Sequence, residues 1–251
     1  IFITNGFFVF LSTVYKFAVD WFFNEKEKRD LENQRLISEL AFLKSQINPH
    51  FLFNSLNAIQ YFVGINDRKA AMIYISSFAA FLRQHLQTAT SLTHPVLKEA
   101  TMLKQYLGLE KTRFAGKFNF EVGLPQEIDL PEMHIPSLLT HSFVEFALYN
   151  RVLHRADNNG FIKISFAKEA NALLIIIDDN GIGKKMSVSI TEIKGINDAT
   201  PDADLMQERL NLLNADHGKQ KITITENDKQ NEDGLVSGTI TIISIPAPLS
   251  I

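Results

Sequence analysis

The stretch QINPHFLFNSLN, residues 46–57, places one imidazole among large apolar residues directly after a proline. Pro49 has no N–H to donate and disfavours helical geometry at Asn48, so we expect a helix to start, bend or loosen beside His50. Imidazole titrates near neutral pH, and its neutral ring nitrogen is a nucleophile. The stretch therefore predicts a histidine presented for chemistry, with a core histidine in a Phe-rich and Leu-rich helix as the alternative.

The composition limits the class of protein. A chain of 251 residues has room for one large or two modest domains, each with its own core. The net charge of -3 gives no electrostatic footprint for nucleic acid, so no direct nucleic-acid partner is expected. The lack of cysteine excludes disulfides, thiolate metal sites and cysteine nucleophiles. The chain begins with Ile rather than Met, and we expect it to be a fragment of a longer protein.

Residues 1–23 are apolar until Lys16 and Asp20 interrupt them. A membrane-spanning helix needs about 20 apolar residues, so this segment predicts the C-terminal part of a transmembrane helix whose beginning is missing. Trp21 and Lys16 would suit the membrane interface. A buried helix of a soluble domain is the alternative, and the lack of a basic start argues against a signal peptide.

Residues 24–46 are rich in charge and lead into Leu36, Leu40, Leu43 and Ile47, at steps of four, three and four residues. Such steps make an a/d seam of the kind that pairs helices. The segment predicts a signalling coiled-coil helix that carries motion from the membrane to His50. An ordinary amphipathic surface helix is the alternative.

Residues 47–117 are expected to be helical. The helix of His50 should continue through Phe62, turn near Gly64 to Asp67, and be followed by a helix from Arg68 to about Gln87 and another over 97–113. Apolar positions recur at helical spacing in the second helix, at Met72, Ile75, Phe78, Ala79 and Leu82. This pattern predicts an antiparallel hairpin, and two hairpins would make a four-helix bundle in a dimer.

Residues 118–251 change to short β-rich runs around helices. Strands are expected at 118–122, 161–166, 172–179, 221–225 and 238–245, and helices at 135–153 and 204–215. A mixed sheet with helices layered on one face is an α+β arrangement. We therefore expect an α+β protein, in which a helical hairpin precedes a layered sheet domain.

The string Asp179-Asn180-Gly181-Ile182-Gly183 follows a strongly apolar strand. A carboxylate at this place can accept a hydrogen bond from an exocyclic amine, and glycines let the backbone approach a flat ring. The string predicts a nucleotide site, with a surface β-turn as the alternative.

Three strings together carry a family resemblance. Residues 46–57 resemble the phospho-acceptor box of the LytS/YehU-type sensor histidine kinases, and LKEATMLKQYLGLEKTRF, residues 97–114, resembles the linker of that family. Residues 179–183 resemble the first glycine box of the histidine-kinase, gyrase and Hsp90-like ATPase fold. The resemblance implies that His50 accepts a phosphoryl group from ATP. It also implies that Asp179 holds the adenine amino group, with Asn180, Gly181 and Gly183 around it.

The helix box departs from this family. Residues 135–151 align without gaps to the family's Pro…Val-Glu-Asn-Ala-x-x-His-Gly helix, and Glu145 matches the carboxylate that helps to organise phosphoryl transfer. Phe146 stands where the family has its magnesium-binding asparagine, and a benzyl group offers no oxygen ligand. No metal ligand is therefore expected at Phe146.

Asn150 and Arg151 replace the family's His-Gly pair. A shifted pairing, with Asn150 and His154 in the roles of the family's asparagine and histidine, needs a one-turn insertion.

The lid motif departs as well. The family's Gly-x-Gly precedes an Arg-Leu helix, whose counterpart is residues 208–213, and the resemblance implies a nucleotide contact for Arg209. Thr200 and Asp202 stand at the glycine positions, and Pro201 would stiffen the lid. Gly195 would substitute after an insertion.

The resemblance implies a membrane-anchored sensor histidine kinase of a two-component system, with its kinase part in the cytoplasm. A homodimer would bind ATP and Mg²⁺, phosphorylate His50 and pass the phosphoryl group to the receiver domain of a response regulator. The alternative is a degenerate kinase with weak or no ATP binding, acting as a scaffold or as one subunit of a heterodimer with an active kinase. An unrelated ATPase of the same fold is a third hypothesis.

Overall fold

The structure is a computed structural model that describes residues 49–89, 91–123, 133–169, 172–184, 186–187, 210–211, 214 and 221–246, together with part of Lys16–Arg29. The chain divides into two units, Ile1–Asn48 and Pro49–Ile251, and every element named below belongs to the second. The described residues of the first unit are helical. Within the described residues no helix combines the length and apolarity needed to span a bilayer. Most of the predicted membrane segment and of the predicted coiled coil lies outside those residues.

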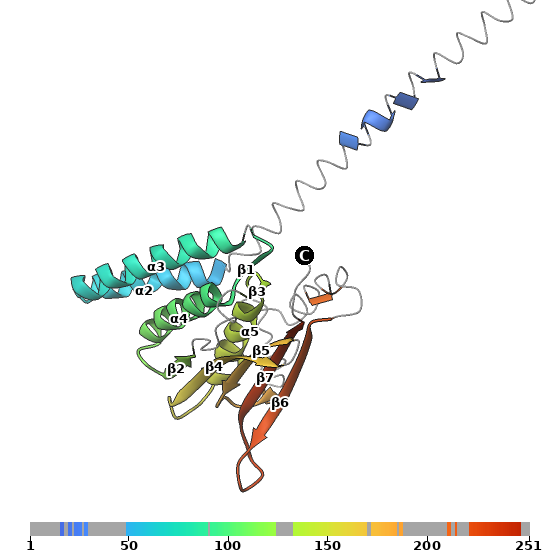
Figure 1. The fold of residues 1–251 in the computed structure, drawn as a ribbon. Coiled ribbons are helices and arrows are strands. Elements are labelled where there is room, and N and C mark those ends of the chain that lie inside the picture. Colours follow the sequence, from blue (N-terminus) through green and yellow to red (C-terminus); the bar gives the residue numbers. More distant parts are fainter. Residues whose placement is uncertain are drawn as a thin grey trace, which may run out of the picture. The chain divides into compact units, whose positions relative to one another are not determined.

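Two helices form the predicted hairpin: α2 (Pro49–Gly64) and α3 (Arg68–Ala89) lie side by side (Figure 1). The turn between them is tight because Asn66 adopts a left-handed φ of 58°, which asparagine tolerates better than most residues. The carboxylate of Asp67 accepts a hydrogen bond from the Ala70 N–H at 2.9 Å and so caps the start of α3.

The buried face of α3 differs from the predicted one. Met72 is 70% exposed and Ile75 is 43% exposed, although both belong to the predicted apolar pattern. The residues that α3 buries are Ala71, Tyr74, Phe81, His85 and Thr88. Hydropathy missed this face because it is partly made of Tyr, His and Thr, which pack as bulky side chains despite their polar atoms. Met72, Ile73, Ile75 and Leu86 are the large apolar residues of α3 that remain exposed.

A small antiparallel pair of strands, β1 (Thr93–Pro95) and β3 (His134–Pro136), flanks helix α4 (Val96–Arg113). The predicted helix over 97–113 is confirmed. The helix predicted from residue 135 begins later, as α5 (Leu139–Ala147), and continues into the π-helix η1 (Leu148–Val152). The prediction was wrong at this start because the residue before Pro136 favours extended backbone, which pairs with β1.

The main sheet has the order β2-β4-β5-β7-β6. Its strands are β2 (Phe118–Val122), β4 (Gly160–Glu169), β5 (Ala172–Asp179), β6 (Thr223–Gln230) and β7 (Val236–Pro246). Strand β2 runs parallel to β4, and the other neighbours are antiparallel. The predicted α+β fold with a mixed sheet is confirmed. Most of the helix predicted at 204–215 lies outside the described residues.

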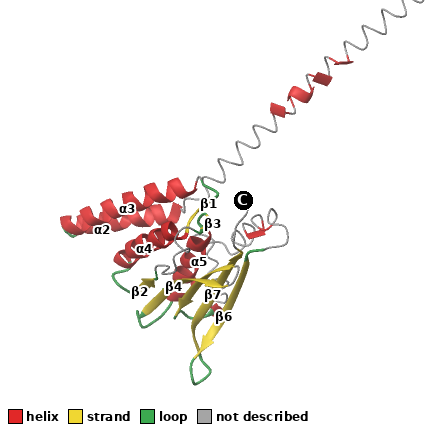
Figure 2. Ribbon diagram, viewed as in Figure 1, coloured by secondary structure: helices red, strands yellow, loops and turns green. Residues whose placement is uncertain are grey.

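One hydrophobic core joins this sheet to the helices, which gather on one side while the strands lie on the other (Figure 2). Side chains alternate along β5, so Leu173, Ile175, Ile177 and Asp179 are buried. The apolar three pack into the core that α4 and α5 share. Asp179 is the last residue of this buried row, and the fold therefore carries a carboxylate into the interior.

Candidate functional site

His50 is the second residue of α2, directly after Pro49. Proline suits the first position of a helix, because the N–H that it lacks would have no partner there. The predicted helix start beside His50 is therefore confirmed, while the side chain of His50 lies outside the described residues. Phe51, the next residue, is buried and packs against Phe81 at 5.3 Å between ring centroids and against Tyr106 at 5.5 Å.

An aromatic cluster continues from this point into α5. The ring of Tyr106, on α4, lies 4.4 Å from the ring of His141, centroid to centroid. His141 also contacts His85 at 5.2 Å and Phe81 at 6.0 Å. The first turn of α2 is thus joined through α3 and α4 to the helix that carries Glu145. The sequence did not single out these residues, because they come from four different helices.

Glu145 lies one turn after His141 on α5 and is buried. Burial raises the pKa of Tyr106 well above its usual value, and the negative charge of Glu145 raises it further. The charge of Glu145 therefore acts on a side chain of α4. Successive helical residues point about 100° apart, and the ring of Phe146 lies instead 5.5 Å from the Arg151 guanidinium carbon.

A buried polar network lies beside Glu145. Tyr149 donates its hydroxyl hydrogen to Glu110 at 2.9 Å, and Arg113 donates to both of these residues. Burial raises the pKa of Glu110, while the Arg113 guanidinium acts in the opposite direction. Burial also raises the pKa of Tyr149, so its hydroxyl stays protonated and remains a donor. The network fixes the end of α4 to η1.

Asp179 lies at the end of β5 and is fully buried. Its Oδ1 accepts a hydrogen bond from the Gly181 N–H at 2.9 Å, and its Oδ2 lies 2.9 Å from Nε of Arg151 in an ion pair. Burial raises the pKa of Asp179, and the charge of Arg151 opposes that rise. Arg151, which stands in place of a family glycine, was not a sequence-predicted binding residue. The structure makes it the principal partner of Asp179.

The other residues of the glycine box serve this arrangement. A Cβ on Gly181 would lie 2.6 Å from backbone atoms of Arg151, so the close approach requires glycine. Gly183 adopts a φ of 82°, which also favours glycine. Asn180 ties β5 to β4 by accepting from the Phe161 N–H at 2.6 Å and by donating to the Asn159 carbonyl at 2.9 Å.

The residues at this site do not fit the cofactors that the resemblance implies. Phe146 offers no oxygen to Mg²⁺, and no metal-binding cluster of His, Cys, Asp and Glu occurs within the described part of the chain. The Asp179 carboxylate already has Arg151 and Gly181 as partners. Arg209 and the lid positions lie outside the described residues.

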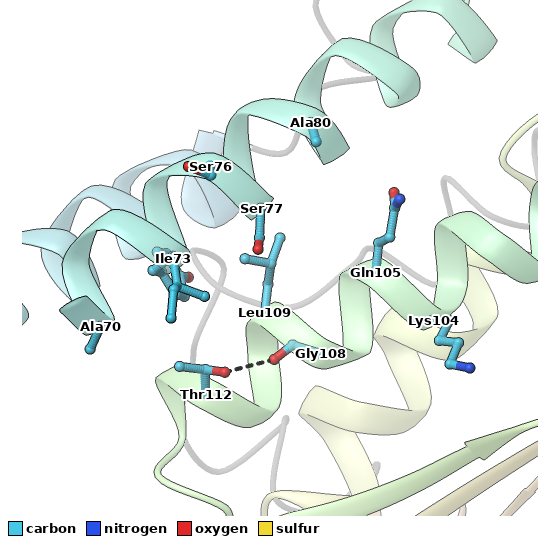
Figure 3. A pocket seen from close by; sticks show the side chains of 11 residues that line it. Ala70, Ile73, Ser76, Ser77, Ala80, Lys104, Gln105, Gly108, Leu109 and Thr112 are labelled. Carbon is cyan, nitrogen blue, oxygen red and sulfur yellow. Dashed lines mark hydrogen bonds between the residues drawn. The ribbon is translucent and has the colours of Figure 1, made fainter.

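A separate pocket of about 710 Å³ lies between α3 and α4 (Figure 3). Ala70, Ser76, Ser77 and Ala80 of α3 line it together with larger side chains. Thr112, on the α4 side, donates its hydroxyl hydrogen to the Gly108 carbonyl at 3.0 Å. The sequence-predicted site residues are not among those that line it.

Two solved structures of histidine kinases align with this chain at low TM-score and low identity. The catalytic domain of the histidine kinase ThkA aligns with a TM-score of 0.36 at 15% identity, over 61% of this chain and 94% of that chain. The mycobacterial sensor histidine kinase MprB aligns with a TM-score of 0.39 at 12% identity, over 61% of this chain and 95% of that chain.

Sequence comparison is more specific. Residues 38–118 match the histidine kinase family. Over 147 residues the chain is 34% identical to the sensor histidine kinase/phosphatase LytS of Staphylococcus aureus strain Mu50. This alignment covers 58% of this chain and 24% of LytS. The same values hold for LytS of strain N315. The match thus spans about a quarter of the length of these curated relatives. The part of the chain that holds His50, in the first turn of α2, thus matches the histidine kinase family, and the chain is similar to the LytS-type sensor histidine kinases.

Proposed function

We propose that the chain is the signalling part of a sensor histidine kinase of a two-component system. A neutral ring nitrogen of His50 attacks the γ-phosphorus of ATP, ADP leaves, and the phosphoryl group then passes to an aspartate on the receiver domain of a response regulator. One observation carries this proposal: His50 follows Pro49 at the start of α2, inside the segment that matches the histidine kinase family. The 34% identity to LytS supports it.

The donor, we infer, is ATP held by a partner subunit. Phosphoryl transfer depends on neutralising the charge that develops on the phosphate oxygens, and Mg²⁺ supplies much of that neutralisation. Phe146 offers no metal ligand, and Asp179 is paired with Arg151. These two features favour a degenerate subunit that accepts a phosphoryl group at His50 within a heterodimer with an active kinase.

The second candidate is a homodimer that phosphorylates His50 with its own ATP. Glu145 favours it, because the family's phosphoryl-transfer carboxylate is retained at that position in α5. Gly181 and Gly183 favour it as well, because the glycines of the family's glycine box are retained at these two positions.

Dimerisation through the α2–α3 hairpin is part of both candidates. Large apolar side chains are exposed along it, at Phe53, Leu56, Tyr61, Val63, Met72, Ile73 and Ile75. Apolar surface of this extent normally marks an interaction site. Two hairpins that pack through these side chains would give a four-helix bundle.

The apolar segment 1–23 supports attachment to the cell membrane, with the kinase part in the cytoplasm.

Labelled ATP with Mg²⁺ tests the proposal. The chain is incubated alone and with an active LytS-type kinase whose own acceptor histidine is replaced. Label on the chain only in the mixture, lost in His50→Gln and kept in His154→Gln, is the expected result. Label on the chain alone would support the homodimeric candidate instead. If neither reaction labels the chain at His50, the acceptor role is wrong.

A further inference from the structure

The Arg151 guanidinium is surrounded by oxygen atoms from three different strands. Its Nε lies 2.9 Å from Asp179 of β5, its Nη1 donates to Glu226 of β6 at 3.2 Å, and its Nη2 donates to Thr241 of β7 at 3.3 Å. The Thr241 hydroxyl in turn donates to Glu226 at 3.2 Å. Nη1 and Nη2 thus each have a hydrogen-bond acceptor, whereas Nε and the Asp179 Oδ2 form an ion pair without a hydrogen bond. A guanidinium spreads its charge and its donors over one plane, so it can face all three side chains at once.

Burial makes this arrangement a built site rather than a surface ion pair. The side chain of Arg151 is 1% exposed, that of Asp179 is 0% exposed, and that of Glu226 is 18% exposed. A cation removed from water to this degree is tolerated only when its charge and its donors are compensated. The ring of Phe146, 5.5 Å from the guanidinium carbon, adds an aromatic surface to one side.

The backbone holds Arg151 at the same place. The π-helix η1 includes this residue, and a π-turn shifts the phase of the side chains that follow it. The Arg151 carbonyl accepts a hydrogen bond from the Ile182 N–H at 3.3 Å. Gly181 packs so closely on Arg151 that a side chain at position 181 would collide with the Arg151 backbone. Both the backbone and the side chain of this residue are thus fitted to the end of β5.

The charges around the Arg151 side chain favour a cation over a polyphosphate at this place. Asp179 and Glu226 face Arg151, and Lys184 lies 3.5 Å from the second oxygen of Glu226. Without Arg151, a buried carboxylate would lack its cationic partner, and a second carboxylate would lie beside the vacated space. A planar cation with several N–H donors would satisfy both carboxylates. A nucleotide triphosphate would bring further negative charge to them.

We propose that the cluster of Asp179, Glu226 and Thr241, called the pocket below, is a guanidinium site that Arg151 of the same chain occupies, at the place where the family resemblance puts adenine. This proposal rests on the proposed function in which a partner subunit holds the ATP, and it deepens that function by naming what fills the pocket in this chain. Arg151 fills the pocket, so the chain folds without a nucleotide there. When the Arg151 side chain is removed by mutation, the empty pocket selects guanidinium-type or amidine-type cations.

Chemical rescue of Arg151→Ala in the full chain tests this. The variant should lose on the order of 10 °C in melting temperature, because it leaves Asp179 unpaired in the interior. About 10 mM guanidinium chloride should restore part of this loss, whereas the same concentration of sodium chloride should not. Arg29→Ala is the matched control, because Arg29 pairs with Glu25 at 3.4 Å with its side chain 73% exposed, and it should show neither the loss nor the rescue.

Arg151→Lys keeps the test informative if Arg151→Ala does not fold. A lysine retains the charge beside Asp179 but cannot also donate to Glu226 and Thr241 from one plane, so the melting temperature of this variant should lie below that of the wild type. A lysine variant equal to the wild type would show that the pocket needs only charge, and the guanidinium proposal would fall. It would also fall if folded Arg151→Ala gave no rescue, or if ADP raised the melting temperature of the wild type.

These measurements are independent of His50. The melting shifts should be the same in a His50→Gln background, because the pocket does not include that residue. Failure to label His50 would therefore leave the pocket result standing. A failed rescue would equally leave the acceptor role of His50 intact.

Discussion

The ring of Phe51 packs on the ring of Tyr106 with their centroids 5.5 Å apart, although the two residues belong to different helices. Phe51 follows the predicted phosphoryl acceptor His50, and Tyr106 reaches His141 of α5 at 4.4 Å. One line of aromatic contacts therefore connects the start of α2 to the helix that carries Glu145. The position of the acceptor turn depends on how α2 packs against α4.

Phe51→Ala is expected to lower the free energy of unfolding by about 3–5 kcal/mol, because it removes a buried ring that contacts several others. Phe161→Ala removes the ring of a residue on β4 that is 37% exposed, and it should lower the free energy of unfolding by less than about 1 kcal/mol. Urea unfolding followed by circular dichroism measures both. Equal losses in the two variants would show that Phe51 does not anchor α2.

The loss caused by Arg151→Ala should depend on pH. Burial already raises the pKa of Asp179, and removing Arg151 takes away the larger of the two positive charges, Arg151 and Lys229, that oppose the rise. A carboxyl whose pKa is higher in the folded state stabilises the fold at low pH, and it loses that contribution as pH rises through the folded pKa. The stability difference from the wild type should therefore be larger at about pH 8 than at about pH 5. Urea unfolding at both pH values measures it, and an equal difference would mean that Asp179 does not carry the effect.

Glu110→Gln should destabilise the protein by about 1–3 kcal/mol, because it leaves the Arg113 charge without its carboxylate and weakens the bond from Tyr149. Glu121→Gln is the control. Glu121 pairs with Lys163 at 3.4 Å on an exposed part of β2, so its loss should be below about 1 kcal/mol. Thermal unfolding of the two variants compares them, and a small effect at Glu110 would count against a stabilising role for the buried network.

Lysine at both Met72 and Ile75 should convert a dimer into a monomer without unfolding the chain, because both side chains are exposed on α3. Their apolar surface would otherwise be covered by a second hairpin. Light scattering after gel filtration gives the mass. Leu235→Lys, at another exposed apolar residue between β6 and β7, should leave the dimer intact. A monomeric wild type, or a dimeric double variant, would contradict the hairpin interface.

Local sequence predicted much of the architecture. The strand expected at 172–179 is β5 from Ala172 to Asp179, and the helix expected from Arg68 is α3. Periodicity and turn residues act over a few neighbouring positions, so they are readable without a fold. The helix expected from residue 135 was misplaced at its start, because Ile135 instead pairs with His94 of β1, which is distant in the chain.

The histidine box, most helices and strands, and the substitution of Phe146 for a metal ligand can be recognised in the sequence. The contacts of Arg151 with Asp179, Glu226 and Thr241 exist only in the folded chain. The difference lies in the range of the interactions involved. Backbone preferences and hydrophobic periodicity are set by near neighbours, whereas a buried charge finds its partners only when the strands that carry them have assembled into one sheet.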